Sequence, residues 1–251
     1  MYLNVFFTPA EIVTSEARLN DIYIVIDVIR ATTTITVMFD QGATRVLAAT
    51  NIEQARAAAE LFPGRVLCGE RNVMPIPGFD YGNSPSQFSQ LDLTGREMVL
   101  TTTNGTRAFH ACPASSVRLA GSLYNAQAVT AYALMLAQER DCNIALVCSG
   151  ETGYFALDDA VCAGYLSLAL QTGLRRGQFL QLHESAHAAI AMYYAYTPPK
   201  VLEHCNSAAS VIQAGLQVDA DFCMQVNQSQ SVAMVVGREK ETDLLILEKC
   251  H

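Results

Sequence analysis

The sequence predicts an α/β fold with a mixed, mostly parallel sheet, or sheets, and helices on both faces. Short apolar runs typical of buried strands alternate along the 251 residues with longer Ala- and Leu-rich segments of helical spacing. Such alternation is typical of helices packed on a largely parallel sheet. Hydrophobic residues make up 51% of the chain, enough for the core of a single domain over residues 1–251. The alternative organisation is two subdomains, about 1–95 and 96–251, with the site between them.

Eight apolar runs are expected to be strands because they are short and rich in Val, Ile and Leu. They are residues 22–27, 45–49, 65–68, 97–101, 117–120, 143–148, 231–236 and 244–247. Helical spacing is found in residues 51–61, 125–138 and 158–171. Residues 178–215 are expected to be all-helical, with a break at Thr197-Pro198-Pro199.

The chain contains a weak internal repeat. Residues 26–70 and 100–151 both run strand, polar turn, helix, strand, helix, strand and end in Gly-Glu. The residue pairs that match at an offset of 73 are Arg45 and Arg118, Gln54 and Gln127, and Ala55 and Ala128. We expect a duplicated βαβαβ unit; the alternative is two ordinary βαβ units that share Ala-rich helices. A duplication places both polar turns at strand carboxyl ends, where ligands bind in open α/β sheets.

Residues 68–85, CGERNVMPIPGFDYGNSP, form the most distinctive segment of the chain. Their glycines and prolines exclude a helix or a central strand, so we expect a long functional loop. Glu70 and Asp80 carry oxygens that suit Mg²⁺, and Arg71 can bind an oxyanion through two N–H groups. Asn83 and Ser84 add polar groups for a substrate.

Two polar turns follow predicted strands and enter helices. In the first, Asp27 can bind Mg²⁺ or act as a nucleophile, and Arg30 follows it. The alternative role for Asp27 is a helix cap. The hydroxyls expected to bind phosphate in this turn belong to Thr32, Thr33 and Thr34.

The second turn is expected to bind an anion through consecutive backbone N–H groups, because Asn-Gly favours a tight turn with positive φ. Its candidate substrate-binding residues are Thr102, Thr103, Asn104, Gly105, Thr106 and Arg107. It lacks the Lys of a P-loop, so it is not a nucleotide fingerprint. An ordinary capped turn is the alternative.

Acidic residues also follow the second Gly-Glu turn. Glu151 ends the turn, and Asp158 and Asp159 begin a predicted helix. Asp159 is a candidate metal ligand; a carboxylate at a helix start also stabilises the helix dipole, which is the alternative role.

The segment His183-Glu184-Ser185-Ala186-His187 fits the H-E-x-x-H pattern of zinc peptidases. The pattern is short, and it lies far along the chain from the other polar groups. We therefore expect an amphipathic helix with both histidines on its more polar face.

Composition restricts the partners of the protein. The net charge of −8 argues against nucleic acid, whose phosphates need a basic surface. No apolar run reaches the length of about 20 residues that a membrane span needs, and the first residues lack a signal-peptide pattern. Eight scattered cysteines without a C-x-x-C pair predict reduced, mostly buried thiols and a cytoplasmic protein. The oligomeric state stays open, and a homodimer is compatible with the sequence.

At these motifs the chain resembles the 2-phosphosulfolactate phosphatases of coenzyme M biosynthesis. The matching blocks are residues 25–35 (VIDVIRATTTI), 69–71 (GER), 78–85 (GFDYGNSP), 100–108 (LTTTNGTRA), 121–125 (GSLYN), 148–153 (CSGETG) and 158–164 (DDAVCAG). Residues 219–223 (DADFC) follow more loosely. Asn72-Val73 stands where the family often has a Gly pair, and Asp158 where it often has Glu.

The resemblance implies a Mg²⁺-dependent hydrolase that releases phosphate from (R)-2-phospho-3-sulfolactate and yields 3-sulfolactate. Mg²⁺ is expected on a subset of Asp27, Glu70, Asp80 and Asp159. Catalytic roles are expected for Asp27, Glu70, Arg30 and Arg71, and Arg107 is a further anion-binding group. A metal-activated water is the expected nucleophile, with direct attack by Asp27 as the alternative. There are two alternative functions. The protein could be a phosphatase for another small phosphorylated acid, or a non-catalytic protein that binds an anion or metabolite.

Overall fold

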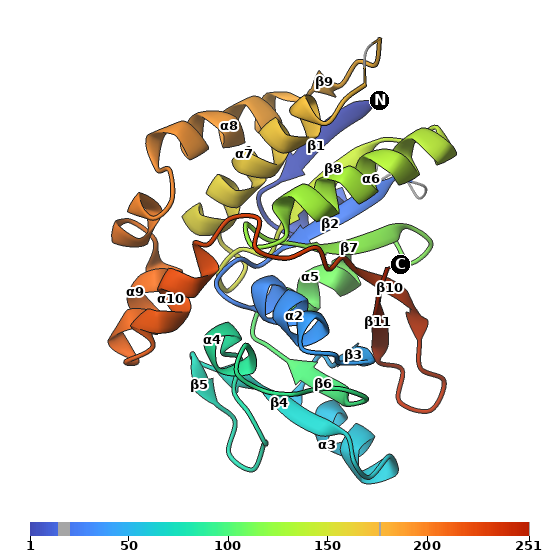
Figure 1. Ribbon diagram of the computed structural model, residues 1–251, viewed down its shortest axis with the longest axis vertical. Helices are drawn as coiled ribbons and strands as arrows, with labels where there is room; N and C mark the ends of the chain where they lie inside the picture. Colours follow the sequence, from blue (N-terminus) through green and yellow to red (C-terminus); the bar gives the residue numbers. More distant parts are fainter. Residues whose placement is uncertain (15–20, 176, 251) are drawn as a thin grey trace.

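A computed structural model describes residues 1–14, 21–175 and 177–250. Within these residues, a single mixed sheet of eleven strands runs through the molecule, in the order β5-β4-β6-β3-β11-β10-β7-β2-β8-β1-β9 (Figure 1). Helices cover the sheet on both faces, so the predicted α/β class is confirmed. No helix among these residues is long and apolar enough to cross a membrane.

Parallel strands make up each half of the sheet. One half contains β1 (Tyr2–Phe6), β2 (Ile22–Ile26), β7 (Val117–Gly121), β8 (Ile144–Cys148) and β9 (Gln181–Leu182). The other half contains β3 (Arg45–Ala48), β4 (Val66–Arg71) and β6 (Glu97–Thr101), with the short antiparallel β5 (Met74–Pro75) at its edge. The inner strands are almost wholly apolar because both of their faces are buried.

An antiparallel hairpin joins the two halves. β10 (Ala233–Arg238) pairs with β7, and β11 (Leu245–Lys249) pairs with β3, over short stretches. The register between the two hairpin strands shifts between Val235 and Gly237. Such a bulge bends a strand and increases its twist, which helps the sheet to curve around the helices between its halves.

The helices form three layers. α6 (Ala126–Arg140), α7 (Leu157–Thr172) and α8 (Glu184–Ala195) cover the outer face of the first half (Figure 1). α2 (Ala31–Asp40), α4 (Pro85–Phe88) and α5 (Gly105–Ala111) pack in a core shared by both halves. α3 (Ile52–Leu61) covers the outer face of the second half. The remaining helices are α1 (Ala10–Thr14), the 3-10 helix Lys200–Glu203, α9 (Asn206–Gln213) and α10 (Gln217–Cys223).

The strand order is symmetric about the hairpin. β6 lies between β3 and β4, and β2 lies between β7 and β8. Each of the two similar sequence units therefore places its first strand between the second and third strands of the other unit. A duplication would produce this order, and the duplication itself stays a prediction.

Most predicted elements are found within two or three residues of their expected bounds. The strand β1 was not predicted, and the segment 178–215 is not all-helical because it contains β9. The segment 68–85 also differs from the expectation. It is not one long loop, because β4 continues to Arg71 and β5 pairs back onto it. The prolines are tolerated there because Pro75 lies on an edge strand and Pro85 begins a helix. The cysteines are free thiols, and six of the eight are buried, as expected.

Candidate active site

A cavity of about 520 Å³ opens where several strands of both sheet halves end. Its walls come from the segments that follow β2, β4, β6 and β8, and from one side of α9. Four of the side chains that line it are charged: Asp27, Arg30, Glu70 and Glu151. Two segments that are distant in the sequence, the turns after β2 and β6, therefore meet at one site.

Asp27 is held rigidly at the start of α2. Its side chain accepts a hydrogen bond from the backbone N–H of Ala31 (3.2 Å), and its residue is 7% exposed. The pKa of Asp27 is raised to about 6, chiefly by burial, and the negative charge of Glu70 acts in the same direction. The backbone N–H groups of Ala31 and Gly105 and the charge of Arg30 act in the opposite direction.

Glu70 connects two turns through its carboxylate. One oxygen accepts the N–H of Val73 (3.0 Å) and the other accepts the N–H of Thr103 (2.8 Å). Asn72 and Val73 both have positive φ, 51° and 72°. A β-branched residue rarely adopts this conformation, so the turn after β4 is strained at Val73. The strain holds a backbone donor against Glu70 at the cavity wall.

Arg30 forms a buried ion pair with a residue of α10. Its Nη1 donates to Asp219 Oδ2 at 2.8 Å, and its Nη2 donates to the carbonyl of Val73 at 2.7 Å. The other oxygen of Asp219 accepts the hydroxyls of Ser84 (2.6 Å) and Ser86. Arg30 is 4% exposed and Asp219 is 1% exposed, so the guanidinium lies in the cavity wall in a fixed position.

The backbone of the turn between β6 and α5 lies so close to Asp27 that only glycine fits at position 105. A Cβ atom on Gly105 would lie 2.6 Å from Asp27 Oδ2 and 2.7 Å from Ala31 Cβ. Gly105 does not have positive φ, so the expected reason for a glycine here is wrong. The close approach of the backbone to Asp27 requires it instead.

These groups place a buried carboxylate, a fixed guanidinium and two polar turns around one cavity. A sequence model described as 2-phosphosulpholactate phosphatase matches residues 6–238. The chain belongs to the 2-phosphosulfolactate phosphatase family.

The similarity to individual members of the family covers most of each chain. A protein of Deinococcus radiodurans named "Probable 2-phosphosulfolactate phosphatase" is 40% identical over 219 residues, 86% of this chain and 88% of the relative. A protein of Thermus thermophilus with the same name is 36% identical over 223 residues, 88% of this chain and 90% of the relative. A third, from Parasynechococcus marenigrum, is 34% identical over 224 residues, 88% of this chain and 90% of the relative.

In this member of the 2-phosphosulfolactate phosphatase family, many predicted site residues line the cavity. They are Asp27, Arg30, Glu70, Asn83, Thr102, Thr103 and Asn104. Ser84 and Gly105 lie directly behind this wall, bonded to Asp219 and packed on Asp27 respectively. Thr106 lies in the first turn of α5, where its backbone N–H donates to the Thr102 hydroxyl (3.2 Å).

Other predicted residues lie away from the cavity. The hydroxyls of Thr32 and Thr33 donate to backbone carbonyls, and Thr34 is fully buried. Arg71 donates to the Thr101 hydroxyl (2.9 Å) and does not line the cavity, and Arg107 is exposed. The exposed Asp80 accepts the N–H of Leu67 (2.8 Å) on β4.

Two buried carboxylates of α7 support the site from behind. Asp159 accepts the N–H of Val28 (2.9 Å) and the N–H of Gly150 (3.1 Å), so it joins the ends of β2 and β8. Burial and the charges of Asp158 and Asp27 raise the pKa of Asp159 well above its usual value. Asp158 accepts the hydroxyl of Ser207 (3.1 Å), and burial raises its pKa to about 7.

The donor set of the cavity fits a magnesium ion. Within the described residues, no three His, Cys, Asp or Glu side chains form a ready metal cluster. The cavity nevertheless contains carboxylate oxygens of Asp27 and Glu70, and the buried amide oxygen of Asn83 has no partner among these residues. Mg²⁺ prefers such oxygen ligands and keeps several waters, so it needs few protein ligands.

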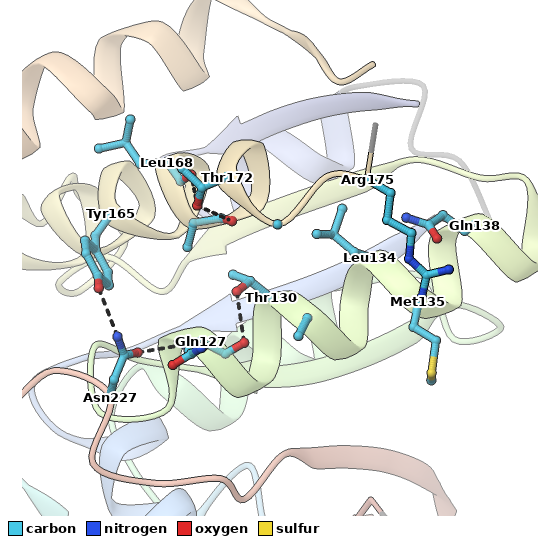
Figure 2. A pocket seen from close by; sticks show the side chains of 13 residues that line it. Gln127, Thr130, Leu134, Met135, Gln138, Tyr165, Leu168, Thr172, Arg175 and Asn227 are labelled. Atoms are coloured by element: carbon cyan, nitrogen blue, oxygen red, sulfur yellow. Dashed lines mark hydrogen bonds between the residues drawn. The ribbon is translucent and has the colours of Figure 1, made fainter. Parts of the chain in front are cut away.

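A larger cavity, of about 710 Å³, lies between α6 and α7 on the outer helix layer. Figure 2 shows Leu134 and Leu168 in its wall, with Tyr165 and Asn227 joined by a hydrogen bond at one end. None of the described residues that line it is Asp, Glu or His, so it lacks the groups for phosphate ester hydrolysis.

The H-E-x-x-H segment does not form a zinc site in the described structure. His183 precedes α8, and its Nδ1 accepts the N–H of Ser185 (3.3 Å) in a cap. His183, Glu184 and His187 are exposed, as expected for a polar helix face.

Several cavity residues were not among the predicted site residues. Ser207, Ser210 and Gln213 come from α9, and Glu151 follows β8. Glu151 had a signal, because it occupies the position of Glu70 in the second sequence unit. No pattern within α9 indicates the site, and around Asp219 only the looser family block DADFC (residues 219–223) pointed to it. Both segments reach the site only through the tertiary fold.

Proposed function

We propose that the protein is a magnesium-dependent phosphomonoesterase that converts 2-phospho-3-sulfolactate to 3-sulfolactate and phosphate. The family and the relatives of this chain are named for this reaction, and these names support the choice of substrate. The observation that carries the chemistry is the convergence of Asp27, Glu70 and Arg30 on one cavity with two polar turns.

The charge of the cavity supports the need for a cation. Three carboxylates line it, those of Asp27, Glu70 and Glu151, against the single guanidinium of Arg30 among the described residues. The substrate adds phosphate, sulfonate and carboxylate groups, which are anionic at neutral pH. Because like charges within a site repel, a divalent cation would lower the free energy of this arrangement.

Asp27, Glu70 and Asn83 would hold the ion. When bound, Mg²⁺ would polarise the phosphoryl oxygens and lower the pKa of a coordinated water.

The residues of the chain supply orientation. Arg30 binds the anionic oxygens of the substrate, and the Thr102–Thr103 turn provides further donors beside it. Water attacks phosphorus in line, the ester P–O bond breaks, and the leaving alkoxide takes up a proton to give the hydroxy acid. Asp27, fixed by backbone N–H groups, orients the attacking water.

The nucleophile can be identified from the stereochemistry at phosphorus, with a substrate made chiral by oxygen isotopes. Direct attack by water is one displacement and inverts the configuration of the released phosphate. An aspartyl-phosphate on Asp27 requires two displacements and retains the configuration.

We expect Asp27→Asn and Glu70→Gln each to lower kcat for phosphate release by at least ~10²-fold, as the loss of a transition-state stabiliser does. His183→Ala, at the exposed N-cap of α8 and away from the cavity, is the control and should keep wild-type kcat. Near wild-type turnover in the Asp27 and Glu70 variants would place the site elsewhere.

Substrate and metal are tested together by phosphate release in the presence of Mg²⁺ or EDTA. We expect turnover of 2-phospho-3-sulfolactate to exceed that of p-nitrophenyl phosphate and 2-phospholactate and to require the metal. A preference for 2-phospholactate would point to another phosphorylated acid. Binding of these compounds without metal-dependent turnover would indicate an anion-binding protein.

A further inference from the structure

Asp219 connects three separate segments at the back of the cavity. One of its oxygens accepts Arg30 Nη1 at 2.8 Å, and the other accepts the hydroxyls of Ser84 at 2.6 Å and Ser86. The backbone N–H of Ser86 also lies 3.4 Å from this second oxygen. The carboxylate is 1% exposed, so water contributes little to its solvation and these donors stabilise its charge.

Arg30 is fixed from two directions. A guanidinium has five N–H donors, and here Nη1 binds Asp219 while Nη2 binds the carbonyl of Val73. The other N–H groups have no acceptor among the residues that the structure describes. Since Arg30 lines the cavity, these donors are available to a ligand there.

We propose that Asp219 is a positioning residue, which holds the Arg30 guanidinium in the orientation that binds the anionic oxygens of the substrate. The proposal rests on the function proposed above. The ion pair is neutral as a whole, so Arg30 would select its ligand by directed hydrogen bonds more than by net charge.

The arrangement also explains why a helix near the end of the chain belongs to the site. α10 contributes no side chain to the cavity wall among the described residues, yet it supplies the carboxylate on which the orientation of Arg30 depends. Ser84 and Ser86 keep that carboxylate in place from the segment after β5.

A double-mutant cycle on kcat/KM tests the proposal. We expect Asp219→Asn to lower kcat/KM for 2-phospho-3-sulfolactate by about 10- to 100-fold, the effect of a misplaced binding group. Arg30→Met should lower it by about 10²-fold. If Asp219 acts through Arg30, adding Asp219→Asn to Arg30→Met should change kcat/KM by less than about 3-fold, because coupled residues are not additive.

Binding of inorganic phosphate, measured by calorimetry in the presence of Mg²⁺, gives a second cycle that needs no turnover. We expect Asp219→Asn to weaken the Kd about 10-fold, with no further loss when Arg30 is already Met. A wild-type protein that binds phosphate but hydrolyses no ester would contradict the proposed function and leave this cycle valid.

Asp40→Asn is the matched control. Asp40 lies at the far end of α2, where one oxygen likewise accepts two serine hydroxyls, those of Ser229 (2.8 Å) and Ser231 (2.6 Å). Its substitution should leave kcat/KM and phosphate binding unchanged.

Three results would overturn the proposal. The first is a lower melting temperature for Asp219→Asn with kcat/KM and the phosphate Kd at wild-type values. The second is an effect of Asp219→Asn that is as large in the Arg30→Met background as in wild type. If Asp219→Asn does not fold, the Ser84→Ala/Ser86→Ala double variant replaces it, since it removes the hydroxyl bonds and keeps both charges. Wild-type phosphate binding in that variant is the third.

Discussion

Contact between the α5 turn and Asp27 leaves no space for a side chain at position 105. The nearest atom that a Cβ would meet is the carboxylate oxygen Oδ2 of Asp27, at 2.6 Å. Either the turn or the carboxylate would have to move, and both belong to the site.

We therefore expect Gly105→Ala to lower kcat by about 10²-fold, since a displacement of 1 Å in a catalytic group has an effect of that size. Steady-state kinetics measures it. Gly237→Ala is the control, because a Cβ there would meet nothing within 4 Å and its φ is not positive. Equal activity in both variants would mean that the two turns are further apart than described.

Val73 adopts a backbone conformation that its side chain disfavours. Its φ of 72° lies in the left-handed region, where a β-branched residue costs about 1–3 kcal/mol. The conformation places its N–H on Glu70 and its carbonyl on Arg30.

Val73→Gly should raise the free energy of unfolding by about 1 kcal/mol, because the relief of strain exceeds the added chain entropy of glycine. Chemical denaturation measures the change, and activity should be retained. Val218→Gly, on an exposed helical position, should instead destabilise the protein by a few tenths of a kcal/mol. A loss of stability in Val73→Gly would show that the turn is unstrained.

At the scale of elements, the first turn of α7 contains two buried carboxylates, Asp158 and Asp159, and burial disfavours the ionised form of both. Burial raises the pKa of Asp158 from 3.8 to about 7, so the native protein holds a proton that the unfolded chain has released. The native state therefore binds more protons between these values, and stability falls as the pH rises through this window.

Asp158→Asn should remove this loss, since the amide oxygen can still accept the Ser207 hydroxyl without carrying a charge. We expect its melting temperature to exceed that of wild type by at least ~3 °C at pH 8, equivalent to about 1 kcal/mol, and to match it near pH 4. Thermal unfolding at both pH values measures this. Asp243→Asn, on the surface, is the control, and its melting temperature should not differ from that of wild type in a pH-dependent way. If both variants shifted the melting temperature by the same amount at both pH values, titration of Asp158 would be excluded as the cause.

Sequence patterns predict the elements of this fold well and the site in part. Apolar runs locate the inner strands that are buried on both faces. The edge strands β5 and β9 have no such signal, and neither has β1, whose buried residues alternate with half-buried ones. The polar turns after β2 and β6 are correctly brought together. Thr32 and Asp80 look equally suited to the site in the sequence, but the local backbone uses their oxygens.

Long-range partners could not be predicted. Asp219 lies 189 residues from Arg30, and Asp159 lies 131 residues from Val28. A single sequence records which side chains can pair, but the pairs form only when α10 packs against α4 and α7 packs against the sheet.

For the whole molecule, an excess of negative charge predicts a response to divalent cations. The chain has a net charge of −8, and three carboxylates face the cavity. Mg²⁺ at about 100 times its Kd should stabilise the protein by about 2.7 kcal/mol, or roughly 5–10 °C. Because protons compete for Asp27, whose pKa is about 6, the shift should be larger at pH 8 than at pH 5.

Differential scanning calorimetry with Mg²⁺, and with EDTA at the same ionic strength, measures this shift. The Asp27→Asn/Glu70→Gln double variant should lose it. An identical shift in that variant would indicate that Mg²⁺ binds elsewhere on the acidic surface.

The interleaved order of β6 among β3 and β4, and of β2 among β7 and β8, has a consequence for how the chain can be divided. A cut between residues 95 and 96 would give two polypeptides, one with β1 to β5 and one with β6 to β11, whose strands alternate at several places along the sheet. Neither fragment would assemble by itself, whereas the pair, mixed in solution, could complement each other and regain the cavity that Asp27 and Glu70 line.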